Sequence, residues 1–289
     1  MQNSFKYITH QLFGLYSENE IRNCWLLIME ELTGYTRTQI LINKNSILSE
    51  EQNEKMQTIA IRLQQGEPIQ YILGKTEFYS LPFELTKNVL IPRPETEELV
   101  DWVLKDNLGF TGNLLDIATG SGCIAIALAK HFTKATIRAI DISEKALDVA
   151  KKNATNNAVN IDFKKMDILK TGKEKEMHCA STEDKAYYDI IISNPPYICE
   201  QEKEYMHNNV LNYEPHLALF VPDDDPLLFY KEIALFASKN LVSGGKLFFE
   251  INQRFGKEVV NLLENAGFAG ICLRKDISGK DRMIKATFV

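Results

Sequence analysis

The sequence is poor in cysteine, and its five cysteines are scattered without a Cys-x-x-Cys pair or a His/Cys cluster. This pattern indicates neither a zinc site nor a disulfide framework, so we expect no metal and a reducing compartment. No run approaches the roughly 20 apolar residues that cross a bilayer. The first residues, MQNSFKYITHQLFGLY, lack the apolar core of a signal peptide. We therefore expect a cytoplasmic protein with no membrane partner.

The chain also has no excess of positive charge. Its 33 Lys and Arg stand against 39 Asp and Glu, which gives a net charge of −6. Phosphate binding relies on clustered Lys and Arg, so this balance disfavours a general nucleic-acid-binding protein. With 289 residues, 45% of them hydrophobic, the chain is long enough for two domains that each bury a core.

The first quarter of the chain has helical periodicity. Apolar residues recur at helical spacing in IRNCWLLIMEEL, at 21–32, and in SEEQNEKMQTIAIRLQQG, at 49–66. Ser49 can cap the start of the second helix, and Gly66 can end it. We predict a separate helical domain over residues 1–74.

The pattern then changes to that of a hairpin. Aromatic and β-branched residues surround the turn-like Ser80-Leu81-Pro82, which predicts a β-hairpin linker over 75–91. A helix is expected from Pro94, because proline is favoured in the first helical turn and the glutamates after it favour the positive end of the helix.

From residue 92 to 289 we predict one α/β domain, because strand-like and helix-like segments alternate. The expected strands are 113–119, 136–142, 161–168, 187–194, 246–252, 271–277 and 282–289. The expected helices are 122–132, 143–157, 226–240 and 255–267. Such alternation is typical of an open, mostly parallel Rossmann-like sheet covered on both faces. Only SGKD joins the last two strands, so they should form an antiparallel hairpin. The polar stretch 171–187 is expected to be a surface loop.

A glycine-rich turn follows the first strand of this domain. It comprises Ala118, Thr119, Gly120, Ser121 and Gly122. Glycines let the backbone turn from strand into helix and approach a ligand closely. Such a turn is by itself weak evidence, because it can be a mere strand–helix connection.

The end of the next strand sharpens the interpretation. Asp141, followed by Ile142, lies where a carboxylate can accept hydrogen bonds from both hydroxyls of a ribose. A dinucleotide-binding fold has the same features, but its G-x-G-x-x-G pattern requires glycine where this chain has Ala125. S-adenosylmethionine (SAM), with a ribose and no phosphate, fits better. Asp167, at the end of the third strand, can meet the adenine amine, or it can equally be a solvated acid.

The strongest motif is Asn194-Pro195-Pro196-Tyr197, directly after the strand YYDIIIS. This strand should lie beside the first, so its end falls in the crevice where such sheets bind ligands. The Asn194 side-chain oxygen and the Pro195 carbonyl can each accept one hydrogen of an NH₂ group, and the prolines hold these acceptors in place. Tyr197 can cover a planar substrate face. The motif predicts a methyltransferase that acts on an amide or amine nitrogen.

With these motifs, the chain resembles the release-factor glutamine methyltransferases, the HemK or PrmC family. The resemblance covers nearly the whole chain. It rests on GEPIQYILGKTEFYSLPF at 66–83, VLIPRPETEELV at 89–100, DIATGSGCIAIALA at 116–129, SNPPYI at 193–198, YEPHLAL at 213–219 and DISGKDRMI at 276–284.

The resemblance implies a seven-stranded catalytic domain and a helical N-terminal domain that helps to hold the substrate protein. It implies methylation of the glutamine amide in the Gly-Gly-Gln loop of peptide chain release factors, with S-adenosylhomocysteine as the second product. It also places Arg93, Glu95 and Thr96, together with Asn194 to Tyr197, at the substrate.

Two positions depart from the family pattern. Ala118 stands where the family usually has glycine, which should be tolerable unless φ there is positive. Ile168 stands where the family tends to have an aromatic residue, so adenine stacking would be replaced by aliphatic packing. Neither departure challenges the chemistry.

Two other functions compete with this interpretation. A DNA adenine or RNA guanine amine methyltransferase would place a flipped base in the same pocket, since such enzymes share the NPPY and glycine-rich motifs. The acidic net charge counts against it. A non-catalytic SAM-binding module is the third hypothesis, and the intact NPPY motif counts against it.

Overall fold

The computed structural model describes residues 1–170 and 187–289, whose contacts divide the chain into two compact units. The smaller unit contains Met1–Lys75 and His207–Tyr213, and the larger contains Thr76–Met206 and Glu214–Val289. The surface loop predicted at 171–187 lies outside the described residues, apart from its last position. No helix within the described ranges is both long and apolar enough to span a membrane.

The smaller unit is helical, as the sequence predicts. Its helices are α1 (Gln2–Leu12), α2 (Glu18–Thr33), α3 (Arg37–Ile42), α4 (Glu50–Gln64), α5 (Ile69–Leu73) and α9 (Asn208–Tyr213). The predicted Ser49 cap of α4 is confirmed, because its side chain accepts from the backbone N–H of Gln52 in a capping box. Packing of one apolar face per helix buries a shared core that includes Ile8, Ile28 and Ile40.

The return of the chain to this unit at α9 has no counterpart in the sequence-based prediction. The Tyr213 hydroxyl donates a hydrogen bond of 2.9 Å to the carbonyl of Gln65, just after α4. This segment is separated from the first helices by more than a hundred residues, so periodicity could not have assigned it to them.

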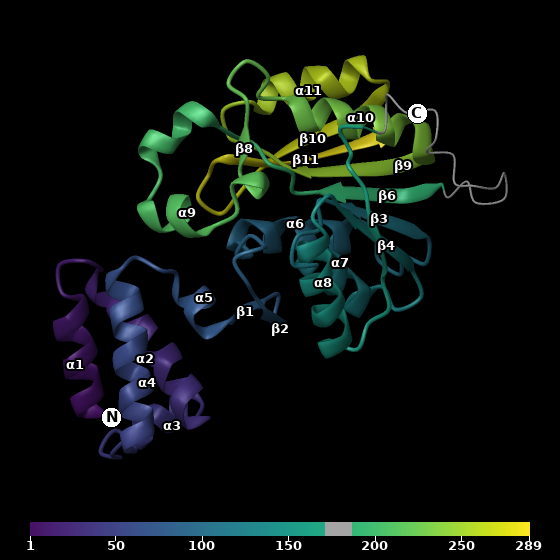
Figure 1. The fold of residues 1–289 in the computed structure, drawn as a ribbon. Coiled ribbons are helices and arrows are strands. Elements are labelled where there is room, and N and C mark those ends of the chain that lie inside the picture. The colour runs from purple at the N-terminus through teal and green to yellow at the C-terminus, as the bar shows by residue number, and fades with distance from the viewer. Residues whose placement is uncertain (171–186) are drawn as a thin grey trace. The chain divides into compact units, whose positions relative to one another are not determined.

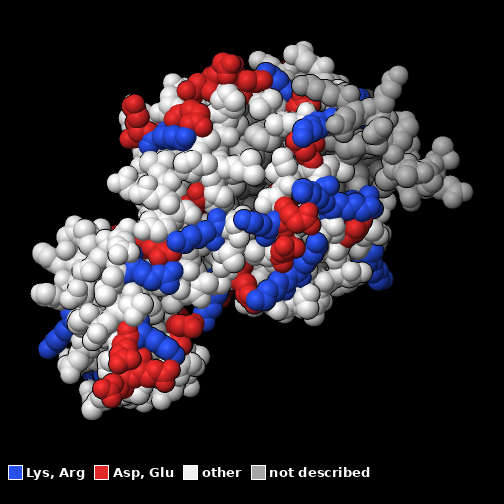
Figure 2. Space-filling model, viewed as in Figure 1, with Lys and Arg blue, Asp and Glu red and all other residues white. Residues whose placement is uncertain are grey.

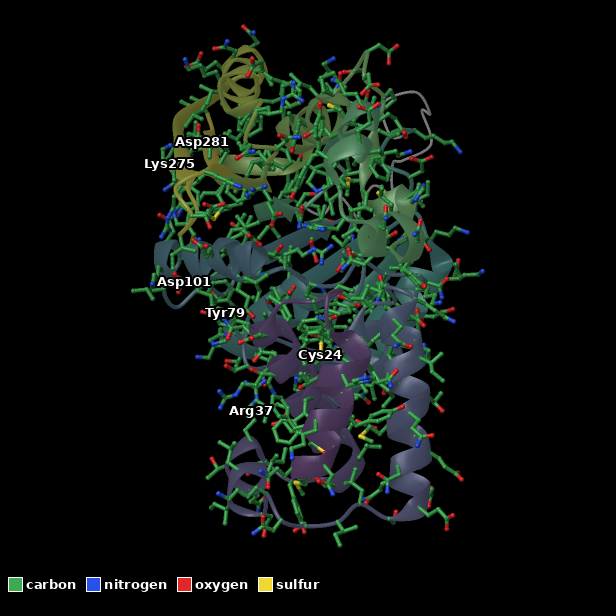
Figure 3. The ribbon with its side chains drawn as sticks, turned by 90° about the vertical axis from the view of Figure 1, so that its left-hand side faces the viewer. Cys24, Arg37, Tyr79, Asp101, Lys275 and Asp281 are labelled. Carbon is green, nitrogen blue, oxygen red and sulfur yellow. The ribbon has the colours of Figure 1, made fainter. Side chains whose placement is uncertain are left out.

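A two-stranded hairpin begins the larger unit, with β1 (Lys75–Phe78) and β2 (Leu81–Glu84). The hairpin is confirmed, but its turn lies at Tyr79-Ser80 and the predicted turn around Ser80-Leu81-Pro82 is wrong. Both turn residues have positive φ, 50° and 59°, as in the two-residue turns whose twist matches that of paired strands. Pro82 lies within β2, where a two-stranded sheet tolerates a missing donor. Glu97 accepts from the backbone N–H of Tyr79, which is labelled in Figure 3.

The predicted seven-stranded, mostly parallel sheet is confirmed. Its order is β10 (Phe268–Lys275), β11 (Asp281–Phe288), β9 (Leu241–Glu250), β6 (Tyr188–Ser193), β3 (Asn113–Ile117), β4 (Thr136–Asp141) and β5 (Asp162–Lys165). Strand β11 runs antiparallel to both of its neighbours, β10 and β9, and the other pairs of strands in this sheet are parallel. As expected, β6 lies beside β3.

Strand β9 starts earlier than the predicted 246–252. Leu241 already pairs with Tyr188, and a register shift follows before Lys246 pairs with Ile190. Gly244, at φ 80°, provides the irregularity. A bulge of this kind interrupts the alternating pattern from which strands are predicted.

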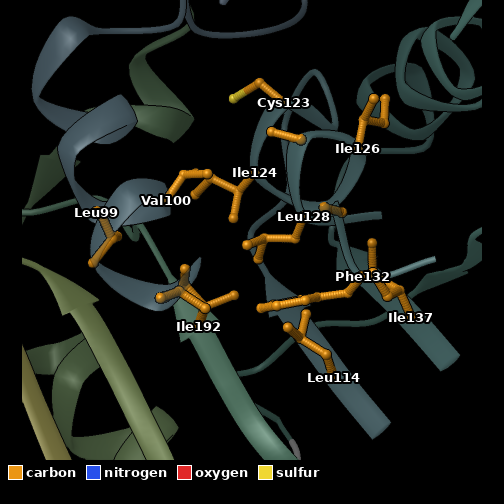
Figure 4. Close-up of a cluster of buried hydrophobic side chains, with 14 of the residues drawn as sticks. Leu99, Val100, Leu114, Cys123, Ile124, Ile126, Leu128, Phe132, Ile137 and Ile192 are labelled. Atoms are coloured by element: carbon orange, nitrogen blue, oxygen red, sulfur yellow. The ribbon is translucent and has the colours of Figure 1, made fainter. Parts of the chain in front are cut away.

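Helices cover both faces of the sheet (Figure 1). The helices α6 (Pro94–Asp106), α7 (Cys123–His131) and α8 (Glu144–Asn156) lie on one face, and α10 (Leu228–Asn240) and α11 (Gly256–Asn265) lie on the other. Neighbouring strand residues alternate between the two cores: Leu114 and Ile192 pack in the first, shown in Figure 4, while Leu115 and Ile191 pack in the second.

Shorter elements complete the larger unit. They are the 3-10 turns at Glu200–Tyr205 and His216–Ala218 and the paired strands β7 (Ile198–Cys199) and β8 (Phe220–Val221). The predicted last hairpin is confirmed in β10 and β11. Lys275 and Asp281, labelled in Figure 3, lie at its closed end with 3.5 Å between Nζ and Oδ1.

Candidate active site

A cavity of about 320 Å³ lies at the carboxyl ends of β3, β4, β5 and β6. The order of the parallel strands reverses beside β3, and open α/β sheets bind their ligands at such a crevice. Most of the predicted site residues line it: Arg93, Thr96, Ala118, Thr119, Gly120, Ser121, Asp141, Ile142, Asp167, Ile168, Asn194 and Pro196. Four others, Glu95, Gly122, Pro195 and Tyr197, are not part of its lining.

The glycine-rich turn is fixed by backbone hydrogen bonds. The Thr119 N–H donates to the Ile140 carbonyl at 3.0 Å, and the Gly122 N–H donates to the Thr119 carbonyl at 2.8 Å. Gly122 has φ 81°, and a Cβ there would lie 3.0 Å from the Ile126 side chain. This position therefore needs glycine for both its conformation and its packing.

Ala118 begins this turn in a strained conformation. Its φ is 59°, in the left-handed region that L residues other than Asn and Asp rarely adopt. The condition under which alanine should be tolerable here, a negative φ, is thus not met. The strain is on the order of 1–2 kcal/mol.

Asp141 ties the end of β4 to the turn. Its Oδ2 accepts from the Gly120 N–H and its Oδ1 from the Ser143 N–H, both at 2.9 Å. Burial raises the pKa of this carboxyl, and the two backbone donors oppose that rise. Each carboxylate oxygen has a second lone pair, so the group retains acceptor capacity toward the cavity.

Two further predicted cofactor residues follow β5. Asp167 lines the cavity, and its carboxylate accepts from the Leu169 N–H at 3.1 Å and lies 3.5 Å from Lys170 Nζ. Ile168 is buried and packs in the second core. The side wall of the cavity at this point is therefore aliphatic, as expected for isoleucine in place of an aromatic residue.

Asn194 is held from behind by two buried side chains. Its Nδ2 donates to Thr96 Oγ1 at 3.1 Å, and the Thr96 hydroxyl donates to Glu250 Oε2 at 2.6 Å. Thr96 is in the first turn of α6 and Glu250 is the last residue of β9, so both are remote from Asn194 in sequence. Burial raises the pKa of Glu250, while the hydrogen bonds it accepts act in the opposite direction.

Tyr197 belongs to the same cluster. Its hydroxyl donates to Glu250 Oε1 at 2.9 Å, and its carbonyl accepts from Asn252 Nδ2 at 3.1 Å. Burial raises the Tyr197 pKa well above the ordinary range of a phenol. The structure thus gives this side chain an anchoring contact, and its predicted packing on the substrate stays a prediction.

Asp116 lies behind the glycine-rich turn. One carboxylate oxygen accepts from the Thr119 hydroxyl at 2.6 Å, and the other has no hydrogen-bond partner among the described residues. Burial raises the pKa of Asp116 to about 7. The carboxyl group of Asp116 is therefore only partly ionised at neutral pH.

Sequence reasoning missed two buried glutamates. Besides Glu250, Glu214 holds the segment before α6, since it accepts from Arg93 Nη2 at 2.5 Å and from the Ile91 N–H at 3.2 Å. The signals were available: Glu250 ends an apolar strand at its carboxyl end, and Glu214 lies within the YEPHLAL segment.

Comparison with known proteins agrees with this geometry. The family model "Methyltransferase small domain" matches residues 96–213, so fold and site together define a methyltransferase. A second model, "PrmC N-terminal domain", matches residues 5–74. The chain is 47% identical to a release factor glutamine methyltransferase of Flavobacterium psychrophilum, over 96% of this chain and 95% of that protein. A protein of the same name from Bacteroides thetaiotaomicron is 43% identical over 97% of both chains. The chain belongs to the release factor glutamine methyltransferase family.

Solved structures share the fold at low identity. The catalytic domain of hMettl16 in complex with a 3′UTR hairpin matches with a TM-score of 0.56 and 17% identity, over 81% of both chains. A 16S rRNA methyltransferase from T. thermophilus, in complex with AdoMet and guanosine, matches with a TM-score of 0.51 and 15% identity, over 74% of this chain and 50% of that one. At these identities the likeness concerns the fold.

Proposed function

We propose that the protein transfers a methyl group from SAM to the side-chain amide nitrogen of the glutamine in the Gly-Gly-Gln loop of peptide chain release factors. The observation that carries the proposal is the position of Asn194. Its amide lines the same cavity as the glycine-rich turn, and two buried side chains fix it there. The family membership supports the same substrate.

The cofactor side of the cavity suits SAM. Asp141 has acceptor capacity left for the ribose hydroxyls. Gly122 brings no side chain into the turn, where a Cβ would crowd the Ile126 side chain. Ile142, Ile168 and Leu169 give the cavity an aliphatic wall that fits a purine. SAM supplies an activated methyl group when bound. The chain's own residues hold it and align the acceptor.

The substrate side addresses the poor nucleophilicity of an amide. An amide nitrogen shares its lone pair with the carbonyl, so it attacks weakly. In the proposed complex, Asn194 Oδ1 and the Pro195 carbonyl each accept one hydrogen of the amide and let the nitrogen pyramidalise toward the methyl group. The contribution is mainly proximity and alignment. No strong base is needed, because the product can lose its proton to water.

We further propose that the helical unit docks the release factor. A glutamine at a loop tip offers few contacts of its own, so binding energy must come from a remote surface. If so, a short Gly-Gly-Gln peptide will be a much poorer substrate than the whole factor.

Mass spectrometry of a release factor incubated with protein and SAM tests the function. One glutamine should gain the mass of one methylene group, and the Asn194→Ala variant should leave it unmodified. DNA and RNA incubated in parallel should remain unmethylated. On the face shown in Figure 2, the Lys and Arg of the larger unit are interspersed with Asp and Glu, unlike the stripes that bind phosphate backbones. Methyl transfer to nucleic acid alone would overturn the proposal.

A further inference from the structure

Three side chains form a series behind the cavity. Asn194 Nδ2 lies 3.1 Å from Thr96 Oγ1, which lies 2.6 Å from Glu250 Oε2. Thr96 and Glu250 are 2% and 1% exposed, so water does not compete for these bonds. The register of the sheet brings them together, because β9 pairs with β6 so that Phe249 is opposite Ser193, one residue before Glu250 and Asn194 respectively.

The series has a direction. The Thr96 hydroxyl donates its single proton to Glu250 Oε2, which leaves its oxygen no other proton to give. The Thr96 oxygen can then only accept from Asn194, and this requirement turns the Asn194 NH₂ group toward Thr96. The amide oxygen is thereby left for the cavity.

A second donor anchors the carboxylate. The Tyr197 hydroxyl donates to Glu250 Oε1 at 2.9 Å, so each carboxylate oxygen accepts one bond from the active-site segments. These two donors fix the position of the carboxyl group and oppose the rise that burial gives to the pKa of Glu250. Glu250 thereby joins the first turn of α6 to the NPPY loop.

We propose that Thr96 and Glu250 are positioning residues that set the polarity of the Asn194 amide, and thereby select a substrate group that donates hydrogens. The inference rests on the proposed function. Without the series, the amide can turn over and present its NH₂ group to the substrate NH₂, donor against donor. Thr96 acts through Asn194 here, because its own hydroxyl proton is donated to Glu250 and not to the substrate.

Substitution at Thr96 provides the first test. Thr96→Val replaces the hydroxyl with a methyl group of similar size. It should lower single-turnover methylation of release factor about tenfold or more, with KM for the factor and the SAM dissociation constant within about twofold. Thr96→Ser keeps the hydroxyl and should recover most of the loss. Thr155→Val removes an exposed helical hydroxyl that donates to the Lys151 carbonyl, and it should match the parent.

Substitution of the carboxylate provides the second test. Glu250→Gln can turn either its oxygen or its NH₂ group toward Thr96, so its rate should fall between those of the serine and valine variants. Thermal unfolding of each variant reports whether the fold is kept. A Thr96→Val enzyme as fast as the parent, or a Thr96→Ser enzyme as slow as Thr96→Val, overturns the proposal.

Side-chain ¹⁵N NMR reads the orientation without catalysis. In the parent, one hydrogen of the Asn194 NH₂ group should exchange slowly with solvent, and Thr96→Val should remove this protection. Equally fast hydrogen exchange in both proteins overturns the proposed positioning of Asn194 by Thr96, even if methylation is normal. A parent protein that leaves release factor unmodified but protects the Asn194 amide overturns the proposed function alone.

Discussion

On one side of the cavity, the hydrogen bonds of the glycine-rich turn and of Asp141 mostly have a backbone N–H or carbonyl as one partner. On the other side, Asn194 is held by the side chains of Thr96 and Glu250, which come from a helix and a strand far away in the sequence. The first side should therefore respond to changes in backbone conformation. The second should respond to the loss of single polar atoms.

The largest effect is expected on the side of the cavity where side chains hold Asn194. Asn194→Ala removes the oriented acceptor and should lower methylation about 10²–10³-fold, the range seen when one such group is lost at a transition state. SAM affinity, measured by calorimetry, should stay nearly unchanged because the cofactor is held elsewhere. Normal turnover of this variant would remove Asn194 from the mechanism.

The next effect concerns stability below the glycine-rich turn. The pKa of Asp116 is raised to about 7 in the folded protein, so the folded state binds this proton more tightly than the unfolded chain. The stabilising effect of protonation is full below the unfolded pKa and is lost as pH rises toward 7.

Asp116→Asn should remove this contribution. Between pH 5 and pH 8 the parent should lose about 2–3 kcal/mol more unfolding free energy than the variant, from about 1.4 kcal/mol per pKa unit. Urea unfolding at the two pH values measures the difference. Equal slopes for both proteins would show that Asp116 is ionised at low cost.

A third effect concerns SAM binding, which should depend on Asp141 and not on Asn194. Asp141→Ala should raise the SAM dissociation constant at least about tenfold, because charge-assisted hydrogen bonds contribute roughly 1.5–3 kcal/mol each. Release-factor binding should not change. Asp141→Asn keeps one acceptor for the Gly120 N–H, so it should lie between parent and alanine variant. If the alanine variant binds SAM as the parent does, another residue holds the ribose.

The smallest effect tests the backbone strain at Ala118, at the start of the glycine-rich turn. Ala118→Gly relieves a φ of 59° and should raise the unfolding free energy by about 0.5–1 kcal/mol, after the entropy that glycine adds to the unfolded chain. Ala158 provides a matched control, since it is exposed, has φ 52° and is not part of the cavity lining. Ala158→Gly should give a similar gain. A loss of stability at Ala118 alone would mean that its methyl group makes a needed contact.

The sequence by itself determined the parts of this protein that depend on neighbouring residues. Alternating strands and helices predicted the sheet, and the short SGKD connection predicted the antiparallel hairpin. The glycine-rich turn and Asp141 were found because they follow two adjacent strands, and Asp141 and most of the turn line the cavity. Backbone turns and periodic apolar faces are local properties, which is why these predictions held.

The tertiary structure alone decided how Asn194 is held. Glu250 lies near Asn194 because β9 pairs with β6, and Thr96 bonds to both because α6 packs over the same strands. It also decided the positive φ of Ala118 and the return of α9 to the helical unit. Side-chain hydrogen bonds between remote segments depend on strand order and register. Neither strand order nor register is encoded in the pattern of any one segment. Glu250 could therefore be seen at the end of a strand in the sequence, but its hydrogen bond to Thr96 could not be predicted.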